Sequence, residues 1–366
     1  MDVLRKTVSG ERAQLKLRPL EQSGGAIPAG SLIVSDVFTS SESHGVDVAK
    51  AAWSLGFQGP IFYQQAVSEP LPPLLEHQQA IVQLNKPDLD KDTVAAALHS
   101  FVLGPPLHML LAATEEVGRA SQSGARNSVL NLSSGTCKAQ VTSLLHHHAL
   151  KGDNPVNFTS NLADFFRLDL EKLAQGNRHE HARLQQSLID FVSESWNRDP
   201  QLPELQKAFH RAVQEFESGH NSVVIAAGNE GLIEPTLEMQ SRSDLQVPAD
   251  FEQNILESPE ATHVGATIIL DGIEAPARYS STWPGVEFYV SGDEVPGAEF
   301  DDSKGLGKSG SSLAAPRVGS LMAEIHHRHP EYSSRQVETA VSEQFASNAI
   351  SMIDTEKARE FLLRVR

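Results

Sequence analysis

The chain contains almost no cysteine: Cys137 is the only one among 366 residues. A single thiol cannot form a disulfide within the chain, so the fold cannot depend on a disulfide framework. The longest apolar stretch, VAAALHSFVLGPPLHMLLAA, is interrupted by a glycine, two prolines and two histidines, and we expect no membrane-spanning segment in it. The first residues, MDVLRKTVSGERAQLKLRP, lack the apolar core of a secretory signal. These absences predict a cytoplasmic protein. Export by a route that needs no signal peptide is left open.

Basic residues are fewer than acidic ones: the chain has 30 Lys and Arg and 47 Asp and Glu, which gives a formal net charge of −17. Nucleic acid and anionic membranes would repel such a chain at long range, so we expect neither as a partner. With 40% hydrophobic and 21% charged residues, the composition is typical of a soluble globular enzyme. No internal repeat or low-complexity linker divides the chain, which predicts one compact domain with additions.

Short β-prone runs alternate with helical patterns over most of the chain. A buried strand ends at Asp36, and His44–Trp53 has apolar residues at helical spacing. An amphipathic helix, Pro203–Ser218, leads directly into the next apolar run. This alternation is typical of parallel α/β units. We predict a three-layer α/β/α sandwich with a mainly parallel central sheet, whose strands lie at 31–35, 60–63, 127–132, 222–227, 262–269, 277–280 and 286–290.

Four polar residues lie where strands end or helices begin. Asp36 ends a strand, His44 starts a helix, Asn229 follows a strand, and Ser312 precedes a helix. A hydroxyl at a helix N-terminus lies near unpaired N–H groups that can bind an oxyanion, and a neighbouring amide can supply a second donor. The hydroxyl needs a base such as imidazole, and the imidazole needs a carboxylate to fix its tautomer. In a parallel sheet such groups converge at the carboxyl ends of the strands.

The segments around these residues resemble motifs of the subtilisin-like serine peptidases, the subtilase or peptidase S8 family. The chain order Asp, His, Ser is that of the family. GSSLAAP at 310–316 resembles its G-T-S-M-A-A-P, SVVIAAGNEG at 222–231 resembles its oxyanion strand and loop, and SHGVDVA at 43–49 is similar to its H-G-T-x-V-A. The resemblance implies a serine endopeptidase acting through an acyl-enzyme. Ser312 would be the nucleophile, His44 the base, Asp36 the orienting acid and Asn229 the oxyanion donor.

The resemblance also implies that substrate binds as an added strand beside LSSG at 132–135. The implied substrate-binding residues are Leu132, Ser133, Ser134, Gly135, Ala227 and Gly228. The partner would be a peptide or protein substrate, and a protein inhibitor or regulatory partner is left open.

The chain departs from the family pattern in several places. Asp36 is followed by Val-Phe, where the family has Ser-Gly or Thr-Gly, and only seven residues separate it from His44. The calcium-binding loop of the family is not recognisable, so we expect no metal and no cofactor. We expect an N-terminal arm at 1–28, a peptidase domain at 29–330 with a helical insertion at about 138–201, and a C-terminal helical extension at 331–366.

Each candidate residue also has an ordinary structural interpretation. Ser312 fits a helix N-cap, Asn229 a turn, His44 a surface histidine in a first helical turn, and Asp36 a strand-end carboxylate. Asp47 is a second candidate for the acid that orients His44. It lies one turn along the same helix as His44, so we expect it to face solvent or cap the helix start rather than reach the imidazole. The surrounding motifs favour the catalytic interpretation.

Other interpretations remain open at this stage. The histidine run at 146–148 could suggest a metal site, but consecutive helical residues diverge, and we expect a solvated run. The unusual Asp36 loop keeps a second hypothesis, a degenerate subtilase that binds peptides without cutting them. A third is an esterase or amidase acting on small acyl compounds. The helix-rich segment 138–201 could regulate access or dock a partner.

Overall fold

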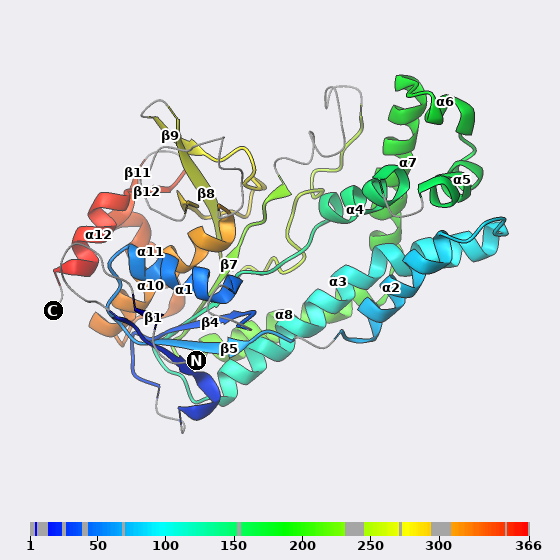
Figure 1. Ribbon diagram of the computed structural model, residues 1–366. Helices are drawn as coiled ribbons and strands as arrows, with labels where there is room; N and C mark the ends of the chain where they lie inside the picture. Colours follow the sequence, from blue (N-terminus) through cyan, green and yellow to red (C-terminus); the bar gives the residue numbers. More distant parts are fainter. Residues whose placement is uncertain are drawn as a thin grey trace.

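The structure is a computed structural model with a central sheet between two layers of helices (Figure 1). The predicted three-layer fold with a mainly parallel sheet is confirmed. The residues described are 4–5, 14–23, 27–38, 43–67, 70–151, 155–230, 245–270, 273–293, 309–347 and 350–364.

In the described part of the chain, eight strands run parallel through the sheet. Antiparallel strands β9 (Ile273–Pro276) and β11 (Ala346–Ser347) pair with β8 and β12. A separate two-stranded ribbon joins β1 (Leu4–Arg5) to β2 (Gln14–Leu15). In spatial order the parallel strands are β3 (Leu17–Pro19), β5 (Ile61–Gln65), β4 (Leu32–Asp36), β6 (Val129–Leu132), β7 (Ser222–Ala226), β8 (Thr262–Leu270), β10 (Phe288–Ser291) and β12 (Met352–Ile353).

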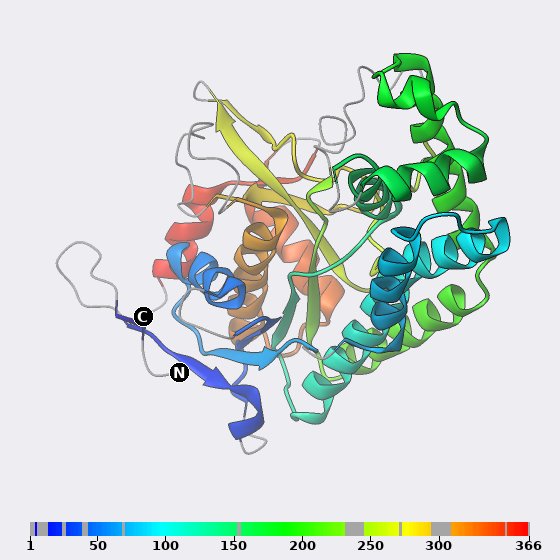
Figure 2. The same cartoon turned by 45° about the vertical axis from the view of Figure 1, so that its right-hand side comes forward.

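Side chains of the central strands alternate between two cores. Leu32 and Val34 pack on one face of the sheet, whereas Ile33 packs on the other, and all three are fully buried. Each such burial contributes about 1.5–3 kcal/mol, so both helical layers are held by the same strands. The first face is covered by α1 (His44–Ser54), α10 (Ser311–Arg328), α11 (Ser334–Phe345) and α12 (Thr355–Leu363); α1 and α10 lie side by side there (Figure 2). The second is covered by α3 (Lys91–Gln122) and α8 (Gln201–Glu217), and α2 (Pro72–Leu84) packs along α3. A 3-10 turn lies at Leu20–Gln22.

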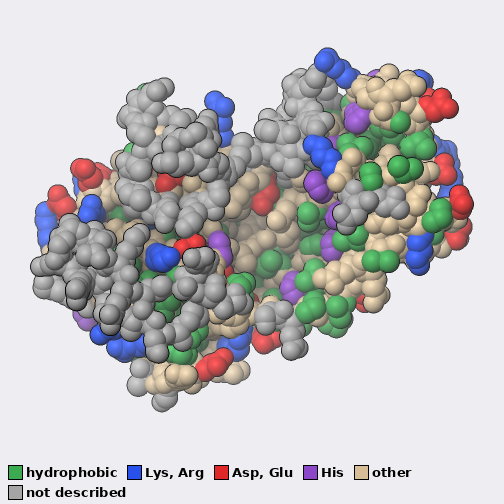
Figure 3. Space-filling view, in the orientation of Figure 1, with side chains coloured by type: hydrophobic (Ala, Val, Ile, Leu, Met, Phe, Trp, Pro, Cys, Tyr) green, Lys and Arg blue, Asp and Glu red, His purple; other side chains and the backbone are tan. Residues whose placement is uncertain are grey.

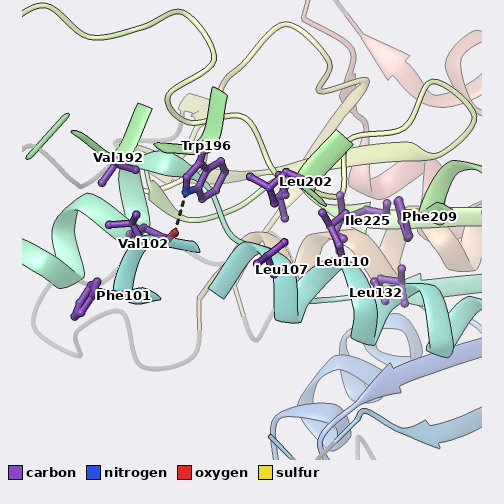
Figure 4. Packing of buried hydrophobic residues seen from close by; sticks show 14 of the residues in the cluster. Phe101, Val102, Leu107, Leu110, Leu132, Val192, Trp196, Leu202, Phe209 and Ile225 are labelled. Atoms are coloured by element: carbon purple, nitrogen blue, oxygen red, sulfur yellow. Dashed lines mark hydrogen bonds between the residues drawn. The ribbon is translucent and has the colours of Figure 1, made fainter. Parts of the chain in front are cut away.

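Helix α3 runs without a break through Pro105 and Pro106. Neither proline has an N–H, so the carbonyls four residues earlier lose their helical partners. His77 Nδ1 lies 2.7 Å from the carbonyl of Phe101, and Trp196 Nε1 donates to the carbonyl of Val102 at 2.9 Å (Figure 4). Two neighbouring side chains thus supply the donors that the prolines lack, and the helix continues.

Among the described residues, α3 is the one helix long and apolar enough to cross a membrane by length and composition. Half of its most apolar window is buried inside the fold, against α2 and α8.

A group of four helices stands beside the sandwich and is here called the helical lobe. It consists of α4 (Lys138–Lys151), α5 (Pro155–Phe166), α6 (Leu170–Ala174) and α7 (Arg178–Arg198), and it fills the segment for which a helical insertion is predicted. The molecule is hollowed between the lobe and the rest, and histidine and hydrophobic side chains gather on the lobe's side of the hollow (Figure 3).

Several local predictions are wrong. Residues 277–280 form a turn, and the strand lies just before them, at β9. Helix α8 begins earlier than Pro203, because the Asp199 carboxylate accepts hydrogen bonds from the N–H groups of Gln201 and Leu202. The C-terminal region is not purely helical, since β11 and β12 extend the sheet.

The histidine run is also only partly solvated. His146 is 3% exposed, and the ring of His148 stacks on Phe158 with centroids 5.9 Å apart. His147 is exposed. The three side chains therefore point in different directions, as expected for consecutive residues of a helix.

Candidate active site

The site begins where strand β4 ends and helix α1 starts. Asp36 is the last residue of β4 and is 8% exposed, whereas His44 is the first residue of α1. Nδ1 of His44 lies 2.8 Å from Oδ2 and 3.0 Å from Oδ1 of Asp36, and the N–H of Val37 donates to Oδ1 at 2.6 Å. The hydrogen bond to Asp36 raises the pKa of His44 above its ordinary value, and it outweighs the lowering by burial. The geometry favours an imidazole with a proton on Nδ1.

The short connection between these residues is closed by the backbone. The N–H of Gly45 donates to the carbonyl of Val37 at 3.0 Å, so the two ends of the loop meet. Residues 39–42, within the loop, lie outside the described residues. Asp47, the competing acid, pairs with Lys50 at 3.1 Å and adds only a charge effect that raises the pKa of His44.

Ser312 reaches the other side of the imidazole from the first turn of α10. Its Oγ lies 3.0 Å from Nε2 of His44, although the two residues are 268 positions apart in the chain. Pro316 has no N–H to bond the carbonyl of Ser312 four residues earlier, and the hydroxyl of Ser133 donates to this carbonyl at 3.2 Å. The first turn of α10 is thereby tied to the segment that follows β6.

The loop at Gly228 and Asn229 is held against the same turn by two hydrogen bonds with Ser311. The N–H of Ser311 donates to Oδ1 of Asn229 at 2.8 Å, and the N–H of Gly228 donates to Oγ of Ser311 at 3.1 Å. With Oδ1 acting as acceptor there, Nδ2 of Asn229 remains a donor. A methyl group on Gly310 would lie 3.2 Å from this Nδ2 and 3.3 Å from Oγ of Ser312, so the amide and the hydroxyl border one small space.

A pocket of about 210 Å³ opens beside the Ser312 hydroxyl. Of the predicted substrate-binding residues, Ser133, Ser134, Gly135, Ala227 and Gly228 line it. Leu132 does not, because its side chain is fully buried in the core on the α3 side of the sheet. Among the described residues the lining consists of 133–137, 140, 226–230, 254, 311 and 312.

Glu230 is the one charged residue among the described residues that line the pocket. Burial raises the pKa of its carboxyl, although the hydroxyl of Ser281 donates to Oε2 at 3.0 Å. Gly228 has φ +116°, and a methyl group there would come 2.2 Å from Oε2. Only glycine therefore lets the backbone turn under this carboxylate.

The subtilase family model matches residues 169–356, just over half of the chain. The chain belongs to the subtilase family. It is therefore a subtilisin-like serine peptidase. The match includes Asn229 and Ser312 but begins after Asp36 and His44, which reach the site only through the fold.

Solved structures of subtilases are similar to this chain at low identity. A lanthipeptide protease is 13% identical, with 91% of this chain and 87% of the other covered and a TM-score of 0.42. A cold-adapted subtilisin-like serine proteinase is 13% identical, with 90% and 88% covered and a TM-score of 0.41. MycP1 from Mycobacterium smegmatis is 15% identical, with 93% and 82% covered and a TM-score of 0.43. A search of curated protein sequences finds no match.

Several residues of this subtilase site were not assigned from sequence. Ser311 links the Asn229 loop to α10, and Glu230 and Asn254 line the pocket. The position of Ser311 beside Ser312, at a helix start, could have indicated Ser311 in advance. Asn254 lies in an irregular segment with no motif, so only the fold reveals it.

Within the described ranges, no three or more His, Cys, Asp or Glu side chains are grouped so that they could hold a metal ion. The expectation of a site without metal or cofactor stays a prediction. Gly231, which ends the expected oxyanion loop, lies outside the described residues.

Proposed function

We propose that this subtilase hydrolyses peptide bonds through an acyl-enzyme on Ser312. The observation that carries the proposal is the hydrogen-bonded chain from Asp36 through His44 to Ser312, with separations of 2.8 and 3.0 Å. Such a chain lets the imidazole accept the hydroxyl proton during attack and return it to the leaving amine. The Asp36 carboxylate orients the ring and stabilises its protonated form.

Asn229 and the N–H of Ser312 are the proposed oxyanion donors. The N–H of Ser312 lies in the first turn of α10, where helical N–H groups have no acceptor within their own helix. The bond from Ser311 to Oδ1 fixes the amide of Asn229 before substrate arrives. Donors that are already oriented toward the developing charge are worth more than donors that must reorganise.

The pocket beside Ser312 would receive the side chain that precedes the cleaved bond, the P1 side chain. Its volume is about 210 Å³. Ionised Glu230 would repel an acidic P1 residue and favour lysine or arginine over it.

A fluorophosphonate probe tests the proposal directly, because it labels only an activated serine. We expect the purified protein to be labelled, Ser312→Ala to be unlabelled, and peptide turnover to fall by several orders of magnitude in that variant. Ser218→Ala is a matched control, since Ser218 is an exposed serine at the end of α8. Absence of Ser312-dependent label would instead support a subtilase that binds peptides without cutting them. Labelling with ester hydrolysis but no cleavage of unfolded protein would support the esterase or amidase.

A further inference from the structure

One residue of the pocket lining, Asn254, lies in a segment without helix or strand. Residues 245–255, which precede β8 in the chain, contain turns and bends, with neither a helix nor a strand in this described stretch. Asn254 lines the pocket and is 4% exposed. Its Nδ2 donates to the carbonyl of Ala226 at 2.9 Å, and its amide lies directly against Gly135, where a methyl group would come within 2.2 Å. Asn254 thus joins the two pocket walls that follow β6 and β7.

Backbone hydrogen bonds attach this segment to the beginning of the helical lobe. The N–H of Ile255 donates to the carbonyl of Thr136 at 2.8 Å, and the N–H of Ala139 donates to the carbonyl of Phe251 at 2.9 Å. Phe251 is 2% exposed and packs in a small core with Cys137, Ala139 and Ile189. The position of Asn254 therefore depends on contacts made by residues of α4 and α7.

An ion pair between a buried lysine and a half-exposed aspartate strengthens this attachment. Nζ of Lys138, the first residue of α4, lies 2.6 Å from Oδ2 of Asp250 and 3.3 Å from Oδ1 of Asn197 on α7. The Lys138 side chain is 6% exposed, whereas Asp250 is 48% exposed. An ammonium group this deeply buried requires its partners, so the pair fixes the segment relative to both helices.

Helix α7 holds the other end of the segment through one glutamine. The N–H of Gln246 donates to Oε1 of Gln186 at 2.8 Å, and Nε2 of Gln186 donates to the carbonyl of Gln246 at 3.1 Å. Ile189, one turn along α7, packs in the small core around Phe251. The lobe therefore contacts the segment at residues 246, 250 and 251.

We propose that the helical lobe is a specificity element, in which Lys138 and Asp250 are positioning residues for the P1 pocket. The pair acts through Asn254: it keeps residues 245–255 against the walls at 133–137 and 226–230, and so sets the depth of the pocket. The lobe would thereby select for peptides whose P1 side chain fills the pocket. This inference rests on the proposed peptidase function.

The test uses Lys138→Met, which keeps most of the buried volume of the side chain but removes the charge. Asp250 is half-exposed, so its carboxylate can be solvated when the partner is lost. We expect kcat/KM for peptides with P1 Leu, Phe or Lys to fall about tenfold, mainly through KM, with P1 Ala peptides changed at most about threefold. The labelling rate with a small fluorophosphonate, which does not fill the pocket, should stay within about twofold.

Two further variants separate pocket positioning from general stability. Adding Asp250→Asn to Lys138→Met should change nothing more, because the pair is already broken. Lys207→Met breaks an exposed pair with Glu204 on α8 and should leave all substrates unaffected.

The outcomes are distinct for the two proposals. An unlabelled wild-type protein refutes the peptidase function itself. If the wild type is labelled, but Lys138→Met changes no substrate or lowers labelling and all peptides equally, the specificity role of the lobe is refuted while the peptidase function stands.

Discussion

Replacement of Asp36 by asparagine should be far more damaging than its near-identical shape suggests. The N–H of Val37 donates to Oδ1 of Asp36, so an asparagine there would place its carbonyl oxygen at Oδ1 and its NH₂ at Oδ2. The NH₂ would then face Nδ1 of His44, which lies 2.8 Å from Oδ2. Nδ1 would have to accept, the ring proton would move to Nε2, and Nε2 could no longer take the proton of Ser312.

The expected loss in kcat for Asp36→Asn is about 10⁴-fold, the size seen when a triad imidazole is held in the wrong tautomer. At about 1.4 kcal/mol per tenfold, this corresponds to about 5.5 kcal/mol of transition-state stabilisation. The pKa of His44 should also fall, because its hydrogen bond with Asp36 is the largest cause of the upward shift. The acid limb of the pH profile of kcat/KM would therefore move to lower pH, since the neutral imidazole is the active form.

Asp47→Asn is the matched control. Asp47 influences His44 only through its charge and pairs with Lys50, so its removal should shift the acid limb slightly to lower pH and leave kcat within a few-fold. Steady-state kinetics on a chromogenic peptide between pH 5 and 9, about two units on each side of neutrality, would give both quantities. An Asp36→Asn enzyme that retains a tenth of wild-type turnover, or an acid limb that does not move, refutes this reasoning about the tautomer.

Three other changes should have defined effects. Trp196→Phe removes the N–H that donates to the Val102 carbonyl and leaves this buried carbonyl unpaired. The free energy of unfolding, measured by denaturant titration, should fall by about 1–3 kcal/mol. An unchanged midpoint would show that another donor replaces Trp196. Burial raises the pKa of Glu217 to about 7, so the ionised carboxylate lowers the stability of the fold as pH rises from about 4.5 through 7. Glu217→Gln should therefore raise Tm at pH 8 and leave it unchanged at pH 5. An equal change in Tm at both pH values would contradict this cause. Glu230→Gln should raise kcat/KM for P1 Asp or Glu peptides about tenfold relative to P1 Lys at pH 8, and an unchanged ratio would place the charge outside the pocket's reach.

Much of the fold could be predicted because its local patterns are strong. The run ending at Asp36, the helix starting at His44 and the helix starting near Ser312 all form within a residue or two of the expected positions. The strand expected at 277–280 failed because a short β-prone run also fits the turn that follows β9. Helix α3 shows another limit of local patterns: a proline pair removes two helical N–H groups, and the donors that replace them come from the distant residues His77 and Trp196.

In the candidate site, too, some residues could be proposed from the sequence, whereas their contacts could not. Ser312 and Asn229 could be proposed from their own segments, because a helix start and a loop after a strand each have local chemistry that is readable in sequence. The separation between His44 and Ser312, 3.0 Å across 268 positions, depends on the order of the strands. No local pattern encodes that order.

The sequence alone determined which chemical groups are available, where strands end and helices begin, and that parallel strands bring their carboxyl ends together. The tertiary structure decided which of these groups touch: Asp36 rather than Asp47 faces the imidazole, and Lys138 of the helical lobe pairs with Asp250. The physical reason is that secondary structure depends on spacing within a few residues. Contacts between side chains depend instead on how whole elements pack, and this packing is settled by burial and pairing across the entire chain.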